Sequence, residues 1–160
     1  MQQNLYMIIN SDSLDILVIL LLTFSITVFA ETDSLAQPQV QAQSGEKLYQ
    51  SGQYEDAIQA FEKAVQMDPE NAEYHHWLGK SYGQLASQSG IFKAYSLSKK
   101  TKEQLERAVE LDNTNIDALA DLLKYYEQAP VFLGGGAEKA EKIRQRLREL
   151  NYNDFDKPGV

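Results

Sequence analysis

Two stretches of the sequence decide the fold: EKAVQMDPEN at Glu62–Asn71 and ERAVELDNTN at Glu106–Asn115. An offset of 44 residues separates them, and five of their ten positions are identical. The alignment continues into the three residues that follow each stretch, AEY at 72–74 corresponding to IDA at 116–118. Self-similarity at this scale is typical of proteins built from stacked structural repeats.

Each repeat is predicted to contain two helices. Apolar side chains within residues 54–67 recur with helical spacing, at Ala57, Ile58, Phe61, Ala64 and Val65. Similar apolar stripes occur within residues 116–126 and 137–150. No alternating strand pattern follows residue 31, so the sequence predicts an all-α fold.

The ends of the predicted helices are marked by polar residues and proline. Asp68-Pro69 ends the helix over residues 54–67, because proline disfavours helical geometry in the residue before it. Asn71 and Asn115 suit the N-caps of the helices that follow, since an asparagine side chain accepts hydrogen bonds from free backbone N–H groups. The turns between repeats are therefore predicted to be short and similar.

The composition limits the classes of function. The 160 residues suffice for about one domain, and 43% hydrophobic content suffices for a packed core. The net charge of −8 argues against a general nucleic-acid binder, which needs clustered positive charge. The absence of cysteine excludes disulfides, thiolate metal sites, a cysteine nucleophile and a lipid-modified N-terminal cysteine.

The N-terminal segment predicts export. The apolar run Ile16–Ala30 is short for a membrane span and ends in Val28-Phe29-Ala30, which suits signal peptidase. We expect a signal peptide at residues 1–30, cleaved after Ala30, and a periplasmic location. The alternative is an uncleaved anchor in the inner membrane, because residues 1–15 contain no lysine or arginine. A flexible lead-in (31–40), a helical domain (41–150) and a C-terminal tail (151–160) complete the expected organisation.

The motifs within this domain resemble the tetratricopeptide repeat (TPR) family, and in particular its small exported bacterial members. Ala57-x3-Phe61-x2-Ala64 matches the second helix of one TPR repeat, and Leu78-Gly79-x2-Tyr82 matches the first helix of the next. The resemblance covers about residues 38–150. It implies a short right-handed solenoid of about three helix-turn-helix repeats that binds protein or peptide on its concave side, without catalysis.

Two insertions depart from the 34-residue TPR period. About ten extra residues lie within Leu85–Ser98, and about five lie around Ala129–Gly136. Both fall between the paired helices of a repeat, so we expect two long loops at the same edge of the solenoid. Functional loops and merely tolerated insertions remain alternatives here, with Phe132 and Leu133 as candidate loop contacts.

The resemblance also implies which residues line the groove, namely the inner face of each first helix: Glu46, Tyr49, Glu73, His76, Lys80, Asp117 and Lys124. Some TPR proteins use a basic clamp there to bind a peptide's C-terminal carboxylate. In this chain, the corresponding positions hold other residues: Ala42, Glu46, Trp77, Asp117 and Asp121. We therefore predict against that class of ligand.

The remaining candidates favour structural roles. His75-His76 point in different directions on a helix, so no metal site is predicted, and His75 is expected in the helix interface. Gly134–Gly136 lacks the residues of a nucleotide-binding loop and favours a tight connection. The basic last helix is interpreted as a solvated face.

These observations predict an exported, noncatalytic adaptor that needs no cofactor and binds a protein or peptide in its groove. No nucleic acid or lipid anchor is expected. A self-associating assembly protein is one alternative, so a homo-oligomer stays open. A small-ligand-binding protein is another.

Overall fold

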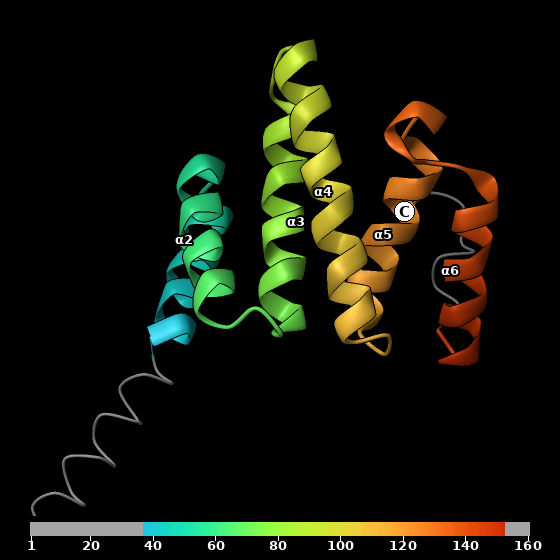
Figure 1. Ribbon diagram of the computed structural model, residues 1–160, viewed down its shortest axis with the longest axis horizontal. Helices are drawn as coiled ribbons and strands as arrows, with labels where there is room; N and C mark the ends of the chain where they lie inside the picture. The colour runs from blue at the N-terminus through green and yellow to red at the C-terminus, as the bar shows by residue number, and fades with distance from the viewer. Residues whose placement is uncertain (1–36, 153–160) are drawn as a thin grey trace, which may run out of the picture. The chain divides into compact units, whose positions relative to one another are not determined.

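The computed structural model describes residues 37–152, and within them the chain is all-α (Figure 1). The helix over residues 37–50 is followed by α2 (Tyr54–Met67), α3 (Ala72–Ser87), α4 (Ile91–Leu111), α5 (Ile116–Gln128), the 3-10 helix η1 (Val131–Leu133) and α6 (Ala137–Glu149). The six α-helices form about three consecutive helix-turn-helix units. The predicted fold class is confirmed.

Asparagine side chains cap the N-termini of α3 and α5, the first helices of the second and third pairs, as predicted. Asn71 Oδ1 accepts hydrogen bonds from the backbone N–H groups of Glu73 and Tyr74, at 3.1 and 3.4 Å. Asn115 Oδ1 accepts from the N–H of Ala118 at 3.0 Å. These bonds satisfy donors that the first turn of a helix leaves free, so the repeated sequence sets the same turn twice.

Two hydrophobic clusters hold the described helices together. The first joins residues 37–50, α2 and α3 around Phe61 and extends to Leu97 of α4. The second joins α4, α5 and α6 around Leu119, Leu122 and Leu147. Residues 31–160 contain every described member of both clusters.

Glycines allow the paired helices to approach closely. A Cβ atom at Gly45 would lie 2.8 Å from the Phe61 ring, and one at Gly79 would lie 3.0 Å from the Leu105 side chain. Neither distance leaves normal room for a larger side chain. Both glycines stand where the TPR register requires a small residue, so the predicted positions of the first two repeats are confirmed.

The insertion within Leu85–Ser98 is helical, which corrects the expectation of a long loop. Helix α3 continues to Ser87 and α4 begins at Ile91, so only three residues connect them. The extra residues lengthen both helices, and the α3–α4 hairpin extends beyond its neighbours (Figure 1). The apolar residue Leu97 is buried in the first core cluster, which explains why this segment continues as helix.

The insertion around Ala129–Gly136 forms η1 and a tight glycine turn. Gly134 has a φ of 88°, and a Cβ atom at Gly135 would lie 1.8 Å from the carbonyl oxygen of Ala129. The three glycine N–H groups donate to the carbonyls of Val131, Pro130 and Tyr126. These bonds use the N–H groups that an anion would need, so the turn has a structural role.

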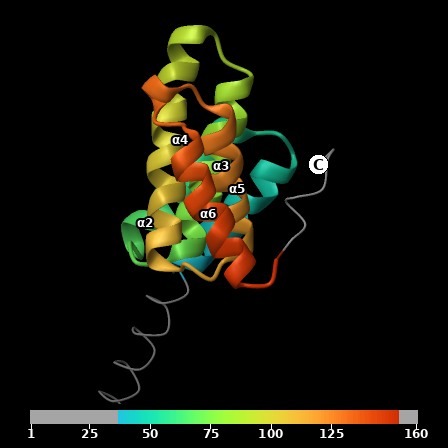
Figure 2. The ribbon, with the colours of Figure 1, turned by 90° about the vertical axis from the view of Figure 1, so that its right-hand side faces the viewer.

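Both insertions lie at the same end of the helices, as predicted (Figure 2). The Tyr95 ring of α4 stacks on the Phe132 ring of η1, with centroids 6.4 Å apart. The predicted signal segment lies outside the described residues. Residues 37–40 of the expected lead-in are helical. Among residues 37–152, no helix is both long and apolar enough to cross a membrane.

Candidate functional site

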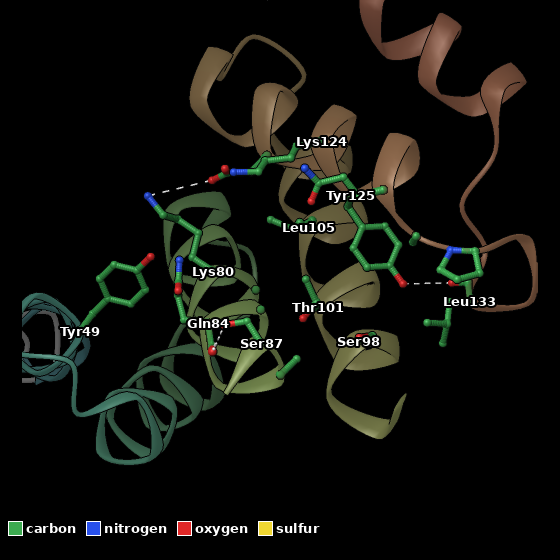
Figure 3. A pocket seen from close by; sticks show the side chains of 17 residues that line it. Tyr49, Lys80, Gln84, Ser87, Ser98, Thr101, Leu105, Lys124, Tyr125 and Leu133 are labelled. Carbon is green, nitrogen blue, oxygen red and sulfur yellow. Dashed lines mark hydrogen bonds and ion pairs between the residues drawn. The ribbon is translucent and has the colours of Figure 1, made fainter. Parts of the chain in front are cut away.

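An open groove of about 490 Å³ lies between the second and third helix pairs. One wall comes from α3 with Tyr49 of the helix over residues 37–50, and the opposite wall comes from α5 (Figure 3). Helix α4 forms the floor through Ser98, Thr101 and Leu105, and the connection to η1 closes one end. The first helix of every pair therefore contributes to this groove.

An aromatic cluster supports the wall around Tyr49. The Trp77 ring stacks on Phe61 and meets Tyr49 edge to face, with centroids 5.9 and 5.3 Å away. Lys80 Nζ lies 4.5 Å from the centroid of the Trp77 ring, which is a cation–π distance. Burial raises the pKa of the Tyr49 hydroxyl, so this group stays neutral and can both donate and accept hydrogen bonds.

A bridge of polar side chains connects the two walls. His76 Nε2 lies 2.8 Å from Asp121 Oδ2, and Lys80 Nζ lies 4.0 Å from the same oxygen (Figure 3 shows the lysine contact). Asp121 thus contacts two side chains of α3. This leaves Lys124 of α5 as an exposed cation that makes no ion pair with other residues of the 37–152 region.

The structure places His76 differently from the sequence-based expectation. Its side chain is 5% exposed, and its ring faces Asp121 rather than open solvent. The helical register gave its direction correctly, but only the position of α5 buries it. His75 packs into the helix interface as predicted, with Nδ1 2.7 Å from Gln104 Oε1 and Nε2 3.0 Å from the carbonyl oxygen of Pro69.

The opposite wall is held by a hydrogen bond to the second insertion. The Tyr125 hydroxyl donates to the carbonyl oxygen of Leu133 at 3.0 Å (Figure 3). Burial raises the pKa of this hydroxyl, which keeps its proton available for the bond. Leu133 lines the groove, whereas the neighbouring Phe132 is 74% exposed and points toward Tyr95.

The other predicted groove residues lie apart from this cavity. Tyr49, Lys80 and Lys124 line it, but Glu46, Glu73 and Asp117 do not. Glu73 and Asp117 occupy the exposed first turns of α3 and α5. Three of the seven predicted side chains, Tyr49, Lys80 and Lys124, therefore line one groove. His76 is connected to it through its contact with Asp121.

Sequence reasoning missed several lining residues: Gln84, Ser87, Ser98, Thr101, Tyr125 and Gln128. Gln84 and Gln128 follow Lys80 and Lys124 by four residues, so the helical period could have found them. Ser98 and Thr101 belong to a second helix. They line the groove because α3 and α5 are spread apart there, which no local pattern indicates.

The basic last helix is mostly paired with acidic side chains. Lys142 Nζ lies 3.0 Å from Glu138, and Arg144 contacts both Glu127 and Glu141. Arg146 pairs with Glu149 at 3.1 Å. These pairs support the interpretation of a solvated face. Among residues 37–152, no group of three or more His, Cys, Asp and Glu side chains is arranged to hold a metal ion.

Comparisons with known proteins identify the repeat. Residues 45–85 match the family model described as TPR repeat, and no curated protein matches the chain. The Arabidopsis OM64 TPR domain is 15% identical, with a TM-score of 0.60 over 76% of this chain and 89% of that one. Domains with this repeat are typically noncatalytic binding modules.

Two further solved structures have the same fold. The first TPR of Spaghetti (RPAP3), bound to the HSP90 peptide SRMEEVD, is 21% identical, with a TM-score of 0.59 over 75% of this chain and 84% of that one. The second TPR of Spaghetti, bound to the same peptide, is 18% identical, with a TM-score of 0.56 over 76% and 95%. The helices of this chain are arranged as in these domains.

Proposed function

We propose that this chain is a noncatalytic interaction module whose groove binds an extended segment of a protein or peptide partner. The observation that carries the proposal is the open groove of about 490 Å³ to which the first helix of every pair contributes. An open groove suits an extended chain, whereas small-molecule sites enclose most of the ligand surface. This geometry favours a peptide over the small-ligand alternative.

The groove side chains suit recognition of a peptide main chain. Gln84, Ser87 and Gln128 offer amide and hydroxyl groups that can both donate and accept hydrogen bonds. Tyr49, Tyr125 and Leu133 add rings and an apolar surface. Two rigid tyrosines provide contact area at a small cost in conformational entropy. The expected ligand is therefore an extended segment with apolar side chains.

The charges of the groove distinguish it from a site for a C-terminal carboxylate. Asp121 is a groove-lining acid, and Lys80 is held against both Asp121 and the Trp77 ring. Lys124 is the cation left for a ligand, so we assign it to an acidic side chain of the partner. We propose that the peptide SRMEEVD, which both Spaghetti domains bind, does not bind here.

The predicted groove residues take different roles in this proposal. Tyr49, Lys80 and Lys124 contact the partner directly. Glu46, Glu73 and Asp117 lie beyond the cavity and would contact only a longer segment. His76 acts through Asp121, because its ring holds that carboxylate at 2.8 Å.

Site-specific photocrosslinking tests the groove. A photoreactive benzoylphenylalanine at Gln84 should crosslink a partner, whereas the same residue at Gln59, on an exposed position of α2, should not. Mass spectrometry of the crosslinked peptide would identify the segment. Gln84→Ala and Lys124→Ala should then weaken its binding, each by about 1–2 kcal/mol. Equal crosslinking from both positions would contradict the groove assignment.

We further propose that the module works after export to the periplasm. The apolar run ending in Val28-Phe29-Ala30 supports this location. Intact-mass analysis of the exported protein should show an N-terminus at Glu31. Retention of residues 16–30 in a membrane fraction would favour the anchored form instead.

A further inference from the structure

The two insertions place exposed apolar side chains on one surface. The tip surface, as we define it, consists of Ile91, Phe92, Tyr95, Val131 and Phe132. Four of these five side chains are 74–90% exposed, and Phe92 at 90% is the most exposed of them. Apolar side chains of this size are rarely so exposed as a group without a binding role.

The members of the tip surface are held together by two elements. Tyr95 lies four residues after Ile91 and three after Phe92, so the three side chains share one face of α4. Tyr95 then stacks on Phe132 with an interplanar angle of 18°, which connects α4 to η1. The patch is therefore continuous across two segments that are more than thirty residues apart in the sequence.

The charge around the tip surface is opposite in sign to that of the whole chain. Between Glu73 and Glu103 the sequence contains no acidic residue and five of its fifteen basic ones. Residues 128–137, which include η1, contain no charged side chain. A chain with a net charge of −8 thus presents a neutral to basic surface at this end.

Three acidic side chains that flank this end are paired. Glu55 of α2 contacts Lys93 at 3.1 Å, and Glu138 of α6 contacts Lys142 at 3.0 Å. Glu127 of α5 contacts Arg144. Nearby cations therefore compensate these three carboxylates.

The lysines next to the tip can reach an anionic surface. Lys99 Nζ lies 5.8 Å from the centroid of the Tyr95 ring, directly beside the apolar patch. The Lys93–Glu55 pair is a surface pair whose two side chains are more than half exposed. Such pairs contribute little, so Lys93 can turn to a phosphate while water solvates the exposed Glu55 carboxylate in its place.

We propose that the tip surface docks on an anionic phospholipid bilayer. Protruding aromatic and aliphatic side chains enter the interface between headgroups and acyl chains, while neighbouring lysines contact lipid phosphates. Tyr95 suits the headgroup level, since its ring is apolar and its hydroxyl is polar. A lipid surface adapts to these protruding side chains without the shaped pockets that a protein partner would need.

This docking leaves the groove available to its ligand. The groove is lined by other residues, and none of the five tip-surface side chains is among them. The proposal also does not depend on residues 1–30. It is tested with residues 31–160, which contain both core clusters and lack the apolar run that would itself bind lipid.

Vesicle co-sedimentation measures the docking. Residues 31–160 should sediment with vesicles of phosphatidylcholine and phosphatidylglycerol, and less with vesicles of phosphatidylcholine alone. The double variant Phe92→Ser/Phe132→Ser should lower the partition coefficient about tenfold. The matched control Val40→Ser/Met67→Ser removes two exposed apolar side chains elsewhere and should leave it unchanged.

A charge-matched pair of variants tests the lysines. Lys93→Gln/Lys99→Gln should lower binding to the anionic vesicles about fivefold. Lys47→Gln/Lys63→Gln changes the net charge equally, at exposed positions earlier in the chain than the tip surface, and should have little effect on vesicle binding. Circular dichroism should show the same helix content in all the variants.

Three results would overturn the proposal. One is no sedimentation with anionic vesicles. Another is binding that the tip variants and their controls change equally. The third is light scattering that shows concentration-dependent self-association, lost in Phe92→Ser/Phe132→Ser, without vesicle binding. The last result would assign the tip surface to a second copy of the chain.

Discussion

The turns that follow α2 and α4 are equivalent in sequence, yet different side-chain contacts hold them. In both, the asparagine N–H donates to the carbonyl oxygen of the aspartate three residues earlier, at 3.4 Å. In the turn after α2, the Pro69 carbonyl oxygen also lies 3.0 Å from His75 Nε2. In the turn after α4, the Arg146 guanidinium of α6 donates instead to the backbone and side-chain oxygens of Asn113, at 2.9 and 3.0 Å.

The cores beneath the two turns differ in the same way. Phe61 and Leu105 stand 44 residues apart, at equivalent positions, and each packs against a glycine of its first helix. Phe61 also stacks on Trp77, whereas Leu105 joins a cluster dominated by leucines. The repeated sequence therefore determines where paired helices come into contact. The side chains of the neighbouring helices determine how much those contacts stabilise the fold.

The largest expected difference concerns these two core residues. Phe61→Ala should lower the free energy of unfolding by about 4 kcal/mol, and Leu105→Ala by about 3 kcal/mol. The aromatic residue leaves a larger cavity and loses its contact with Trp77. Chemical denaturation of residues 31–160 measures both values. A larger loss at Leu105 would contradict this ranking of the two core residues.

Glycine substitutions probe the close approach of paired helices. Gly79→Leu should cost about 1–3 kcal/mol, because a Cβ atom at this position would lie 3.0 Å from the Leu105 side chain. Gly83→Ala is the matched control, since its Cβ would lie 3.5 Å from Thr101, an ordinary contact. It should raise the thermal midpoint slightly, because alanine favours helix over glycine. An unchanged midpoint in Gly79→Leu would contradict the placement of the second repeat.

The two turn contacts should differ in strength. His75→Ala should cost about 2 kcal/mol, since the buried ring leaves polar groups of Gln104 and Pro69 without partners. Arg146→Ala should cost less than about 1 kcal/mol, because water can replace its contacts at this more exposed position. Thermal unfolding of both variants provides the comparison. A greater loss at Arg146 would reverse the ranking of the two turns.

The smallest expected difference between the two regions concerns a hydrogen bond that the repeat duplicates. Tyr82 donates to Glu62, and Tyr126 donates to Glu106 at 2.7 Å, again with an offset of 44 residues. Tyr82→Phe and Tyr126→Phe should each cost about 1 kcal/mol at neutral pH. Denaturation at pH 7 tests whether the two values agree.

These tyrosines also give the stability a pH dependence. Burial, and then the bond to the glutamate, raises the pKa of both hydroxyls above the usual value of 10.0. The folded state therefore holds protons that the unfolded state loses above about pH 10, so stability falls as the pH rises beyond that point. The thermal midpoint between pH 8 and 11 should fall less steeply in the double phenylalanine variant.

The sequence was informative wherever a local pattern sets the structure. The stripe around Phe61, the caps at Asn71 and Asn115, and the small residues Gly45 and Gly79 act within one helix or between helices adjacent in the chain. Their periods and positions therefore predicted the helix pairs correctly. The candidate groove residues Tyr49, Lys80 and Lys124 followed from the same register.

The segment within Leu85–Ser98 shows where local reasoning failed. Its length suggested a loop, because it interrupts the 34-residue period. The structure continues α3 and α4 through it, since Leu85 and Ala86 of α3 and Leu97 of α4 are buried in the first core cluster. An insertion can lengthen both helices of a hairpin without disturbing the next repeat, and the period alone does not distinguish this from a loop.

By itself, the sequence determined the all-α class, the helix pairs, their caps and the close contacts at the glycines, because these depend on residues near in the chain. Only the tertiary structure decided that His76 is buried against Asp121, that Ser98 and Thr101 line the groove, and that Tyr95 meets Phe132. Each of these depends on the distance and angle between helices from different repeats. That geometry follows from the packing of whole side-chain clusters, which no single stretch of sequence specifies.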